Sequence, residues 1–264
     1  MNLEHIIDAV SSRQYDRNSP PEPKTCDCKL FSIPWFYIEN LGWKSQSKCE
    51  QCQKKDAFYL VAKDKDEVII QLLKESGLKG KLLRMTLNNL YCHDHKLIFD
   101  TVIKYCSNFT NATKRGLFIH GNPGLGKTHL AAGLTRDIIE KHETKVLFYS
   151  SVDLLLQIRW AMNESMVSET NLITKLANCP LLVIDDLGTE KVTDWVQQII
   201  YKIIDDRNLL EKPTVITSNY SLEGLAPKIG EKITSRMIEM CQLIHMQGED
   251  FRVKSKLKNN KSKE

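Results

Sequence analysis

Short runs of consecutive apolar residues recur through the second half of the chain, and most of them end in polar residues. Five such runs cover residues 116–120, 145–150, 181–186, 213–219 and 241–246. Runs of this length are typical of strands that are buried on both faces. Helical spacing lies between them, most clearly in 192–210, whose apolar residues are Val196, Ile199, Ile200, Ile203 and Ile204. Five strands joined by helical crossovers predict an α/β fold with a parallel, covered sheet.

A glycine-rich segment joins the first of these strands to the helix that follows it. It consists of Gly121, Asn122, Pro123, Gly124, Leu125, Gly126, Lys127 and Thr128. Glycines let the backbone turn tightly and point its N–H groups inward, and the start of a helix adds a positive dipole end. Strand, glycine-rich loop and helix is the order of a phosphate-binding P-loop, so the segment predicts an ATP site. In such a site Lys127 contacts the β- and γ-phosphates, and the Thr128 hydroxyl binds Mg²⁺.

Two acidic residues, Asp185 and Asp186, end the apolar run 181–186 in the pattern called Walker B. The end of a parallel strand places Asp185 at the carboxyl edge of the sheet, beside the P-loop, where it can hold Mg²⁺ directly or through water. Asp186 is then positioned to polarise the attacking water. Many proteins with this pattern carry Glu at the second position, and Asp is one methylene shorter, so the metal role of Asp185 is the more secure of the two.

Composition limits the setting in which the protein works. The chain has 264 residues and a formal net charge of +4, which does not by itself require a nucleic-acid partner. Its apolar runs are far shorter than the ~20 residues of a membrane span, and its first residues lack the apolar stretch of a signal peptide. We therefore expect a cytoplasmic protein without a membrane partner. Its eight cysteines should then be thiols or metal ligands.

Four of the cysteines form two close pairs, Cys26 with Cys28 and Cys49 with Cys52, separated by twenty residues. This spacing resembles a zinc ribbon, in which four thiolates surround one Zn²⁺. The segment between the pairs can form a hairpin and contains four aromatic residues, Trp35, Phe36, Tyr37 and Trp43. So short a segment rarely folds without a metal or a disulfide. The alternative is four reduced cysteines without metal.

The chain divides into four parts on these patterns. We expect an N-terminal helix and zinc-ribbon-like domain in 1–62, a helical linker in 63–85, an ATPase domain in 86–252 and a basic tail in 253–264. The short amphipathic pattern within 1–19 fits either a helix packed on its own domain or a docking helix for a partner. The lysine-rich tail fits either a solvated end or an arm that contacts phosphates.

Four motifs in order give residues 80–252 a specific resemblance. They are GNPGLGKTHL at 121–130, LLVIDDLG at 181–188, TVITSN at 214–219 and EKITSRM at 231–237. Together they resemble the DnaC/DnaI-type helicase loaders and the related IstB-type transposition ATPases. The resemblance implies an AAA+ P-loop core whose five strands lie in the order 5-1-4-3-2, without a large C-terminal helical lid.

The resemblance also implies roles for single residues. Asn219 matches the sensor residue that orients the attacking water, and Arg236 lies in the segment that carries the arginine finger. Arg252 matches a terminal arginine that faces the nucleotide, although it also fits membership of the basic tail. Thr193 and Trp195 match positions with which DnaC-type loaders contact single-stranded DNA, although Trp195 fits packing at a helix start equally well.

Three functions remain open on the sequence. The first is an ATPase that loads the replicative DNA helicase onto single-stranded DNA and forms a nucleotide-dependent homo-oligomer; the cysteine-bearing N-terminus favours it, because DnaI-type loaders have such a domain. The second is an IstB-type ATPase that assists a transposase on duplex DNA. The third is a nucleotide-gated adaptor that binds a partner through its ribbon and hydrolyses little ATP.

Overall fold

The computed structural model divides the chain into two compact units, 1–67 and 68–264, each of which we describe by itself. The residues described are 22, 24–25, 29, 32–33, 35–38, 42–45, 49–90, 96–164, 166–190, 192–248 and 250–251. In the described residues, no helix is long and apolar enough to cross a membrane.

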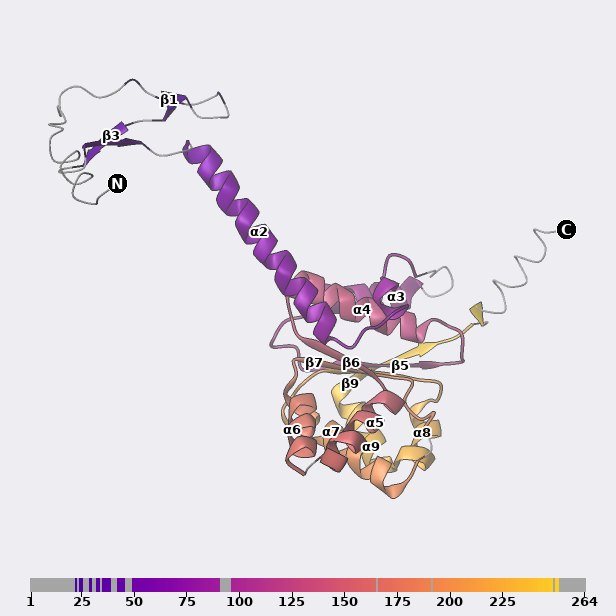
Figure 1. Cartoon of the computed structure of the whole chain (residues 1–264). Coiled ribbons are helices and arrows are strands. Elements are labelled where there is room, and N and C mark those ends of the chain that lie inside the picture. Colours follow the sequence, from indigo (N-terminus) through magenta and orange to yellow (C-terminus); the bar gives the residue numbers. More distant parts are fainter. Residues whose placement is uncertain are drawn as a thin grey trace. The chain divides into compact units, whose positions relative to one another are not determined.

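The first unit contains two short antiparallel strand pairs (Figure 1). They are β1 (Lys24–Thr25) with β2 (Ser32–Ile33) and β3 (Trp35–Ile38) with β4 (Gly42–Ser45). Helix α2 then runs over Glu50–Glu75 and crosses the boundary between the units. The expected start of this helix, near residue 63, was therefore wrong by about three and a half turns. No glycine or proline interrupts 50–62, so nothing in that segment stops a helix from starting earlier.

A five-stranded parallel sheet forms the centre of the second unit. Its strands are β5 (Gly116–Gly121), β6 (Val146–Ser150), β7 (Leu181–Asp185), β8 (Thr214–Ser218) and β9 (Cys241–Met246). They lie in the order β6-β7-β8-β5-β9, and every neighbouring pair is parallel. If β5 to β9 are numbered 1 to 5, this order is 2-3-4-1-5, which is the expected order 5-1-4-3-2 read from the opposite edge of the sheet. The α/β fold and the strand order are confirmed.

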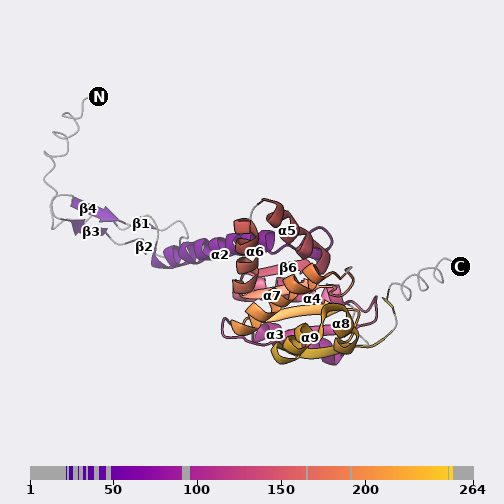
Figure 2. The same ribbon diagram turned by 90° about the horizontal axis from the view of Figure 1, so that it is seen from below.

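Helices cover both faces of the sheet (Figures 1 and 2). One face packs against α3 (Lys96–Ser107) and α4 (Lys127–His142), and the last turns of α2 join the same core. The other face is covered by α5 (Ser151–Glu164), α6 (Met166–Asn178), α7 (Asp194–Leu209), α8 (Leu222–Ile229) and α9 (Glu231–Met240). A short 3-10 helix, η1 (Leu82–Arg84), contacts α4.

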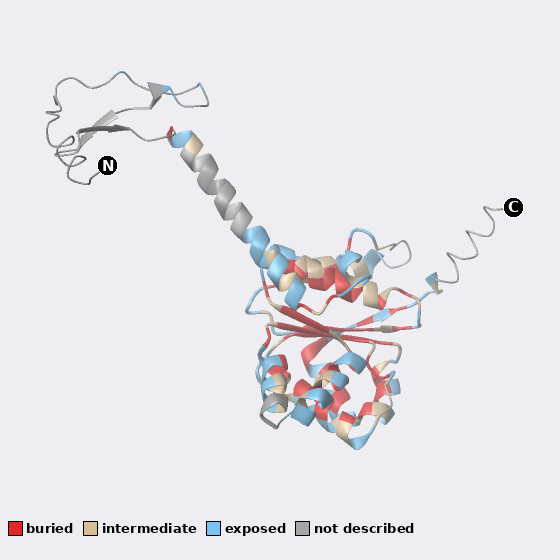
Figure 3. Ribbon diagram, in the orientation of Figure 1, coloured by how far each residue is buried: buried red, intermediate tan, exposed pale blue. Residues whose placement is uncertain are grey.

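Residues along each central strand alternate between the two cores. On β5, Phe118 belongs to the core under α5–α9, and its neighbours Leu117 and Ile119 belong to the core under α3 and α4. The buried residues accordingly follow the strands and the inner faces of the helices (Figure 3). Because all strands are parallel, the carboxyl ends of β5, β7 and β8 meet at one edge of the sheet.

Candidate nucleotide-binding site

The P-loop lies between the end of β5 and the first residue of α4, as the sequence predicted. Gly126, just before the helix, has φ 92°, a left-handed conformation that glycine adopts without steric cost. The Lys127 side chain is buried, with 6% of its surface exposed. Its Nζ donates to the carbonyl oxygens of Gly121 at 2.7 Å and Asn122 at 2.8 Å. The ammonium group thus lies inside the curve of the loop, where phosphate oxygens are bound in P-loops.

Close approaches of other segments explain two of the loop glycines. A Cβ on Gly121 would lie 2.0 Å from the carbonyl oxygen of Met246, at the end of β9. A Cβ on Gly124 would lie 2.0 Å from a carboxylate oxygen of Asp250. The N–H of Phe251 also donates to the Gly124 carbonyl at 3.1 Å. The segment after β9 therefore lies directly against the P-loop.

Asp185 connects the end of β7 to the P-loop helix and to β8. Its Oδ2 accepts from the Thr128 hydroxyl at 3.0 Å, and its Oδ1 accepts from the Thr217 hydroxyl at 2.6 Å. Only 6% of the Asp185 surface is exposed, and this burial raises the pKa of its carboxyl group, against the opposing effect of both hydroxyls. A hydroxyl and a carboxylate oxygen are the hard ligands that Mg²⁺ prefers, so Thr128 and Asp185 fit the predicted metal role. A cation there would favour the ionised carboxylate that burial disfavours.

Asp186 follows Asp185 in an unusual backbone conformation. Its φ is 60°, in the left-handed region that residues with a side chain seldom adopt, although Asp does so more readily than most. Its N–H donates to the Thr217 hydroxyl at 2.8 Å, and its Oδ1 accepts from Nδ2 of Asn219 at 2.8 Å. The structure therefore brings Asp186 and Asn219 into contact, although they follow different strands, β7 and β8.

The turn after Asp186 contains site residues that the sequence analysis missed. The Thr189 hydroxyl donates to the Asp186 carbonyl at 2.9 Å, and Ser151 Oγ lies 3.0 Å from the same oxygen. Ser151 Oγ also donates to Oε2 of Glu190 at 2.8 Å. The available signal was a polar residue at or just after the end of an apolar strand, since Ser151 follows β6 and Thr217 lies within β8. Thr217 belongs to the TVITSN motif, which gave a role only to Asn219, and Ser151 belongs to none of the four motifs.

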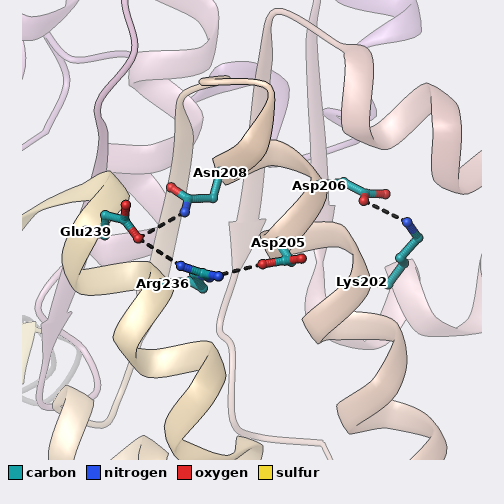
Figure 4. A network of polar contacts seen from close by, with 6 residues as sticks. All are labelled: Lys202, Asp205, Asp206, Asn208, Arg236 and Glu239. Carbon is teal, nitrogen blue, oxygen red and sulfur yellow. Dashed lines mark hydrogen bonds and ion pairs between the residues drawn. The ribbon is translucent and has the colours of Figure 1, made fainter.

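Arg236, the predicted arginine finger, lies on α9 in a network of charged side chains (Figure 4). Its Nε donates to Oδ1 of Asp205 at 3.0 Å, and its Nη1 donates to Oε2 of Glu239 at 3.2 Å. Asn208 donates to the same Glu239 oxygen at 3.0 Å. The Arg236 side chain is 40% exposed. Its ion pairs with Asp205 and Glu239 join it to α7 and to its own helix, and not to the P-loop.

The two predicted DNA contacts lie at the start of α7. Thr193 is the N-cap of this helix, and its hydroxyl accepts from the Val196 N–H at 3.4 Å. Trp195 is partly buried against the core under α5–α9. The guanidinium of Arg159, on α5, lies 4.9 Å from the centre of the Trp195 ring, within the range of a cation–π contact.

The other predicted site residues fall partly outside the described residues. Arg252, Cys26 and Cys28 are among those outside. Cys49 is buried, and Cys52 lies in the first turn of α2 rather than in a knuckle. Within the described part of the chain, no group of three or more side chains could hold a metal ion. The zinc site therefore stays a prediction.

Comparison with known proteins adds the family. The model of the IstB-like ATP binding protein family matches residues 94–259. The "Replicative helicase loader DnaC" of Buchnera aphidicola subsp. Baizongia pistaciae is 29% identical over 181 residues, which are 67% of this chain and 73% of that protein. The protein of the same name from Escherichia coli strain K12 is 32% identical over 117 residues, 44% of this chain and 47% of its own length.

Solved structures agree with this match. A structure titled "Crystal structure of the DnaC helicase loader" has a TM-score of 0.60 and 31% sequence identity to this chain. The similarity covers 64% of this chain and 100% of that one. The chain thus contains the whole of the domain seen in that crystal structure, whereas its sequence match spans about half of the Escherichia coli protein.

Proposed function

The chain belongs to the family of IstB-like ATP-binding proteins, and from this premise we propose its function. It binds ATP, hydrolyses it to ADP and phosphate, and uses the cycle to load a replicative DNA helicase onto single-stranded DNA. The single observation that carries the proposal is the P-loop beside Asp185, Asp186 and Asn219, in a domain similar to a DnaC helicase loader over that structure's whole length.

Each site residue has a part in hydrolysis. Lys127 and the P-loop amides hold the phosphates, and Thr128 with Asp185 would hold Mg²⁺, which neutralises charge on the β- and γ-phosphates when bound. Asp186 accepts a hydrogen bond from the attacking water, and Asn219 fixes the direction of the Asp186 carboxylate by its 2.8 Å bond. Much of the rate acceleration comes from aligning the water with the γ-phosphate, because the protein itself takes little part in the covalent chemistry.

A second copy of the chain completes the site. Arg236 acts in trans, in a nucleotide-dependent homo-oligomer, where a guanidinium stabilises the charge that develops on the γ-phosphate. This role agrees with the exposure of Arg236 and with its distance in sequence from the P-loop. Arg252 faces the nucleotide from its own chain, a role supported by the contact of the neighbouring Phe251 with Gly124.

The first unit binds the helicase. Cys26, Cys28, Cys49 and Cys52 hold one Zn²⁺ there, a proposal that rests on their spacing. Metal analysis of the purified full chain should find about one zinc per chain, and a chelator should unfold this unit before the ATPase domain. Protein that contains no metal, with the unit still folded, would end the zinc proposal without affecting the ATP site.

Deposition of a replicative helicase on protein-coated single strands tests the function as a whole. Adding the full chain with ATP should increase deposition, and Lys127→Ala should not. The family name leaves an IstB-type role as the second candidate. Unchanged deposition, together with binding to a transposase and a preference for duplex DNA, would favour that candidate.

A further inference from the structure

Glu190 lies in the turn between β7 and α7, and no motif of the sequence assigns it a role. We propose that Glu190 is a positioning residue for ATP hydrolysis, because its carboxylate fixes the turn that carries Asp186. The proposal rests on the ATPase activity proposed above and concerns the same site.

One carboxylate oxygen of Glu190 holds two parts of the chain together. Oε2 accepts from the N–H of Gly188 at 3.1 Å, inside the turn, and from Ser151 Oγ at 2.8 Å, at the start of α5. Ser151 is buried, with 1% of its surface exposed, so its hydroxyl is a fixed point of the fold. The carboxylate thus ties the turn after β7 to a buried helix start.

The turn itself has little freedom to adjust. Gly188 has φ 94°, and a Cβ added to it would lie 2.5 Å from a methyl group of Leu225. Leu187 is buried, its N–H donates to the Thr217 carbonyl at 2.9 Å, and its own carbonyl accepts from the Ser218 hydroxyl at 2.6 Å. Because this short segment has few alternative conformations, a displacement of Gly188 also displaces Asp186, two residues earlier.

Ser151 cannot hold both of its acceptors at once. Its hydroxyl has one proton, and both the Glu190 carboxylate and the Asp186 carbonyl lie within reach, at 2.8 and 3.0 Å. The charged carboxylate is the stronger acceptor and lies closer. The Asp186 carbonyl is then held by the Thr189 hydroxyl at 2.9 Å. Without Glu190, the Gly188 N–H loses its acceptor, and the Ser151 hydroxyl donates to the Asp186 carbonyl instead. The hydrogen bonds that fix the turn after Asp186 would then be different.

Backbone position matters more at Asp186 than it would for a longer acid. Aspartate has one methylene fewer than glutamate, so its reach toward a water depends directly on where its Cα lies. A displacement of about 1 Å at a reacting group can lower a rate about a hundredfold. Glu190 supplies the contact that links this Cα position to the buried start of α5.

Three variants of the full chain test the proposal. Glu190→Ala should lower kcat about tenfold and leave KM and the Kd of a non-hydrolysable ATP analogue within twofold. Glu190→Gln should keep at least half of kcat, because its one amide oxygen can accept both of the bonds that Oε2 accepts. Glu164→Ala, at the exposed end of α5, is the matched control and should behave as the wild type. Melting temperatures of all variants identify any that fail to fold.

Hydrogen exchange of the amides in 186–190 gives a second readout that does not need turnover. Exchange there should rise in Glu190→Ala and stay near the wild type in Glu190→Gln. If the wild type binds ATP without hydrolysing it, the proposed ATPase fails and with it the role of Glu190 in hydrolysis, and the exchange result then decides only whether Glu190 fixes the turn. Unchanged exchange, unchanged kcat in Glu190→Ala, or equal losses in the Ala and Gln variants would each overturn the positioning role.

Discussion

Asn219 donates a 2.8 Å hydrogen bond from Nδ2 to Oδ1 of Asp186, and this bond joins the carboxyl ends of β8 and β7. This bond fixes the direction of the Asp186 carboxylate. In the mechanism proposed above, Asn219 acts on the step in which water attacks and does not itself hold phosphate.

Asn219→Ala should therefore lower kcat for ATP hydrolysis at least tenfold while the Kd for ATP stays within about twofold. Steady-state turnover and calorimetric titration measure the two quantities. Asn178→Ala is a matched control, because Asn178 is an exposed asparagine whose side chain bonds its own helix. Equal losses of affinity and turnover would mean that Asn219 contacts the nucleotide instead.

Lys127→Ala should weaken ATP binding more than tenfold, because the proposed phosphate site would lose the ammonium group that lies inside the P-loop. Isothermal calorimetry with ATP measures the loss, and circular dichroism checks that the fold persists. Lys141→Ala, near the other end of the same helix, removes an equal charge from the ion pair of Lys141 with Asp137. ATP affinity that is the same in both variants would refute the assignment of Lys127.

Asp185→Asn should stabilise the nucleotide-free protein while abolishing Mg²⁺-dependent hydrolysis. Burial raises the pKa of this carboxyl, so the folded state binds a proton more tightly than the unfolded state. That contribution to stability is present below the ordinary pKa of an aspartate and is lost as the pH rises through the raised value. The melting temperature of the variant should exceed that of the wild type at neutral pH, and the difference should shrink toward low pH. A lower melting temperature at pH 7 would contradict this account.

The sheet and the P-loop were predictable because each has a strong local signal. A parallel strand buried on both faces is a continuous apolar run, and the P-loop needs glycines at fixed spacing. The local sequence of residues 116–128 is therefore enough to predict a strand followed by a P-loop. The strand order came from the resemblance to a family, because nothing local sets the order of crossovers.

Contacts between distant segments were not predictable in the same way. Arg207 is fully buried, and its guanidinium donates to the carbonyls of Leu176 and Cys179 and to the Thr214 hydroxyl. In the sequence, Arg207 is only a basic residue near the end of a predicted helix, and nothing in the pattern marks it as buried. Glu190 and Ser151 are equally ordinary until the fold brings β6 and β7 together. The early start of α2 was missed because the cysteines and aromatic residues before residue 63 suggested a zinc ribbon. The absence of glycine and proline from 50–62, which permits a helix there, was given too little weight.

Arg236→Ala should bind ATP normally and hydrolyse it at least tenfold more slowly. In the single chain Arg236 pairs with Asp205 and Glu239 at the surface, where ion pairs contribute little to stability, so a neighbouring nucleotide can draw the guanidinium away at low cost. Mixing the variant with Lys127→Ala chains should partly restore turnover, since one chain supplies the site and the other supplies the arginine. Co-assembly without rescue at any mixing ratio would argue for a role within the chain.

Trp195 and the basic tail should affect single-stranded DNA binding in different ways. Stacking of a base on an aromatic ring is worth ~1–3 kcal/mol and is not ionic, so Trp195→Ala should lower affinity about tenfold at every salt concentration. Tyr201→Ala, in the same helix and similarly aromatic, is the control and should have little effect. Deleting 253–264 should instead make the fall of affinity with salt less steep, because fewer lysines displace counterions from phosphates.

Arg159 could affect single-stranded DNA binding in either of two ways. Its guanidinium is 4.9 Å from the centre of the Trp195 ring, so it can either cover the ring or contact a phosphate. If it covers the ring, a base must displace it, and Arg159→Ala should raise affinity with an unchanged salt slope. If it contacts phosphate, the variant should lose affinity and the slope should become shallower by about one ion. Its exposed position on α5 favours the phosphate contact, so we expect the second result. Fluorescence anisotropy with a labelled single strand, measured across a salt series, separates the two.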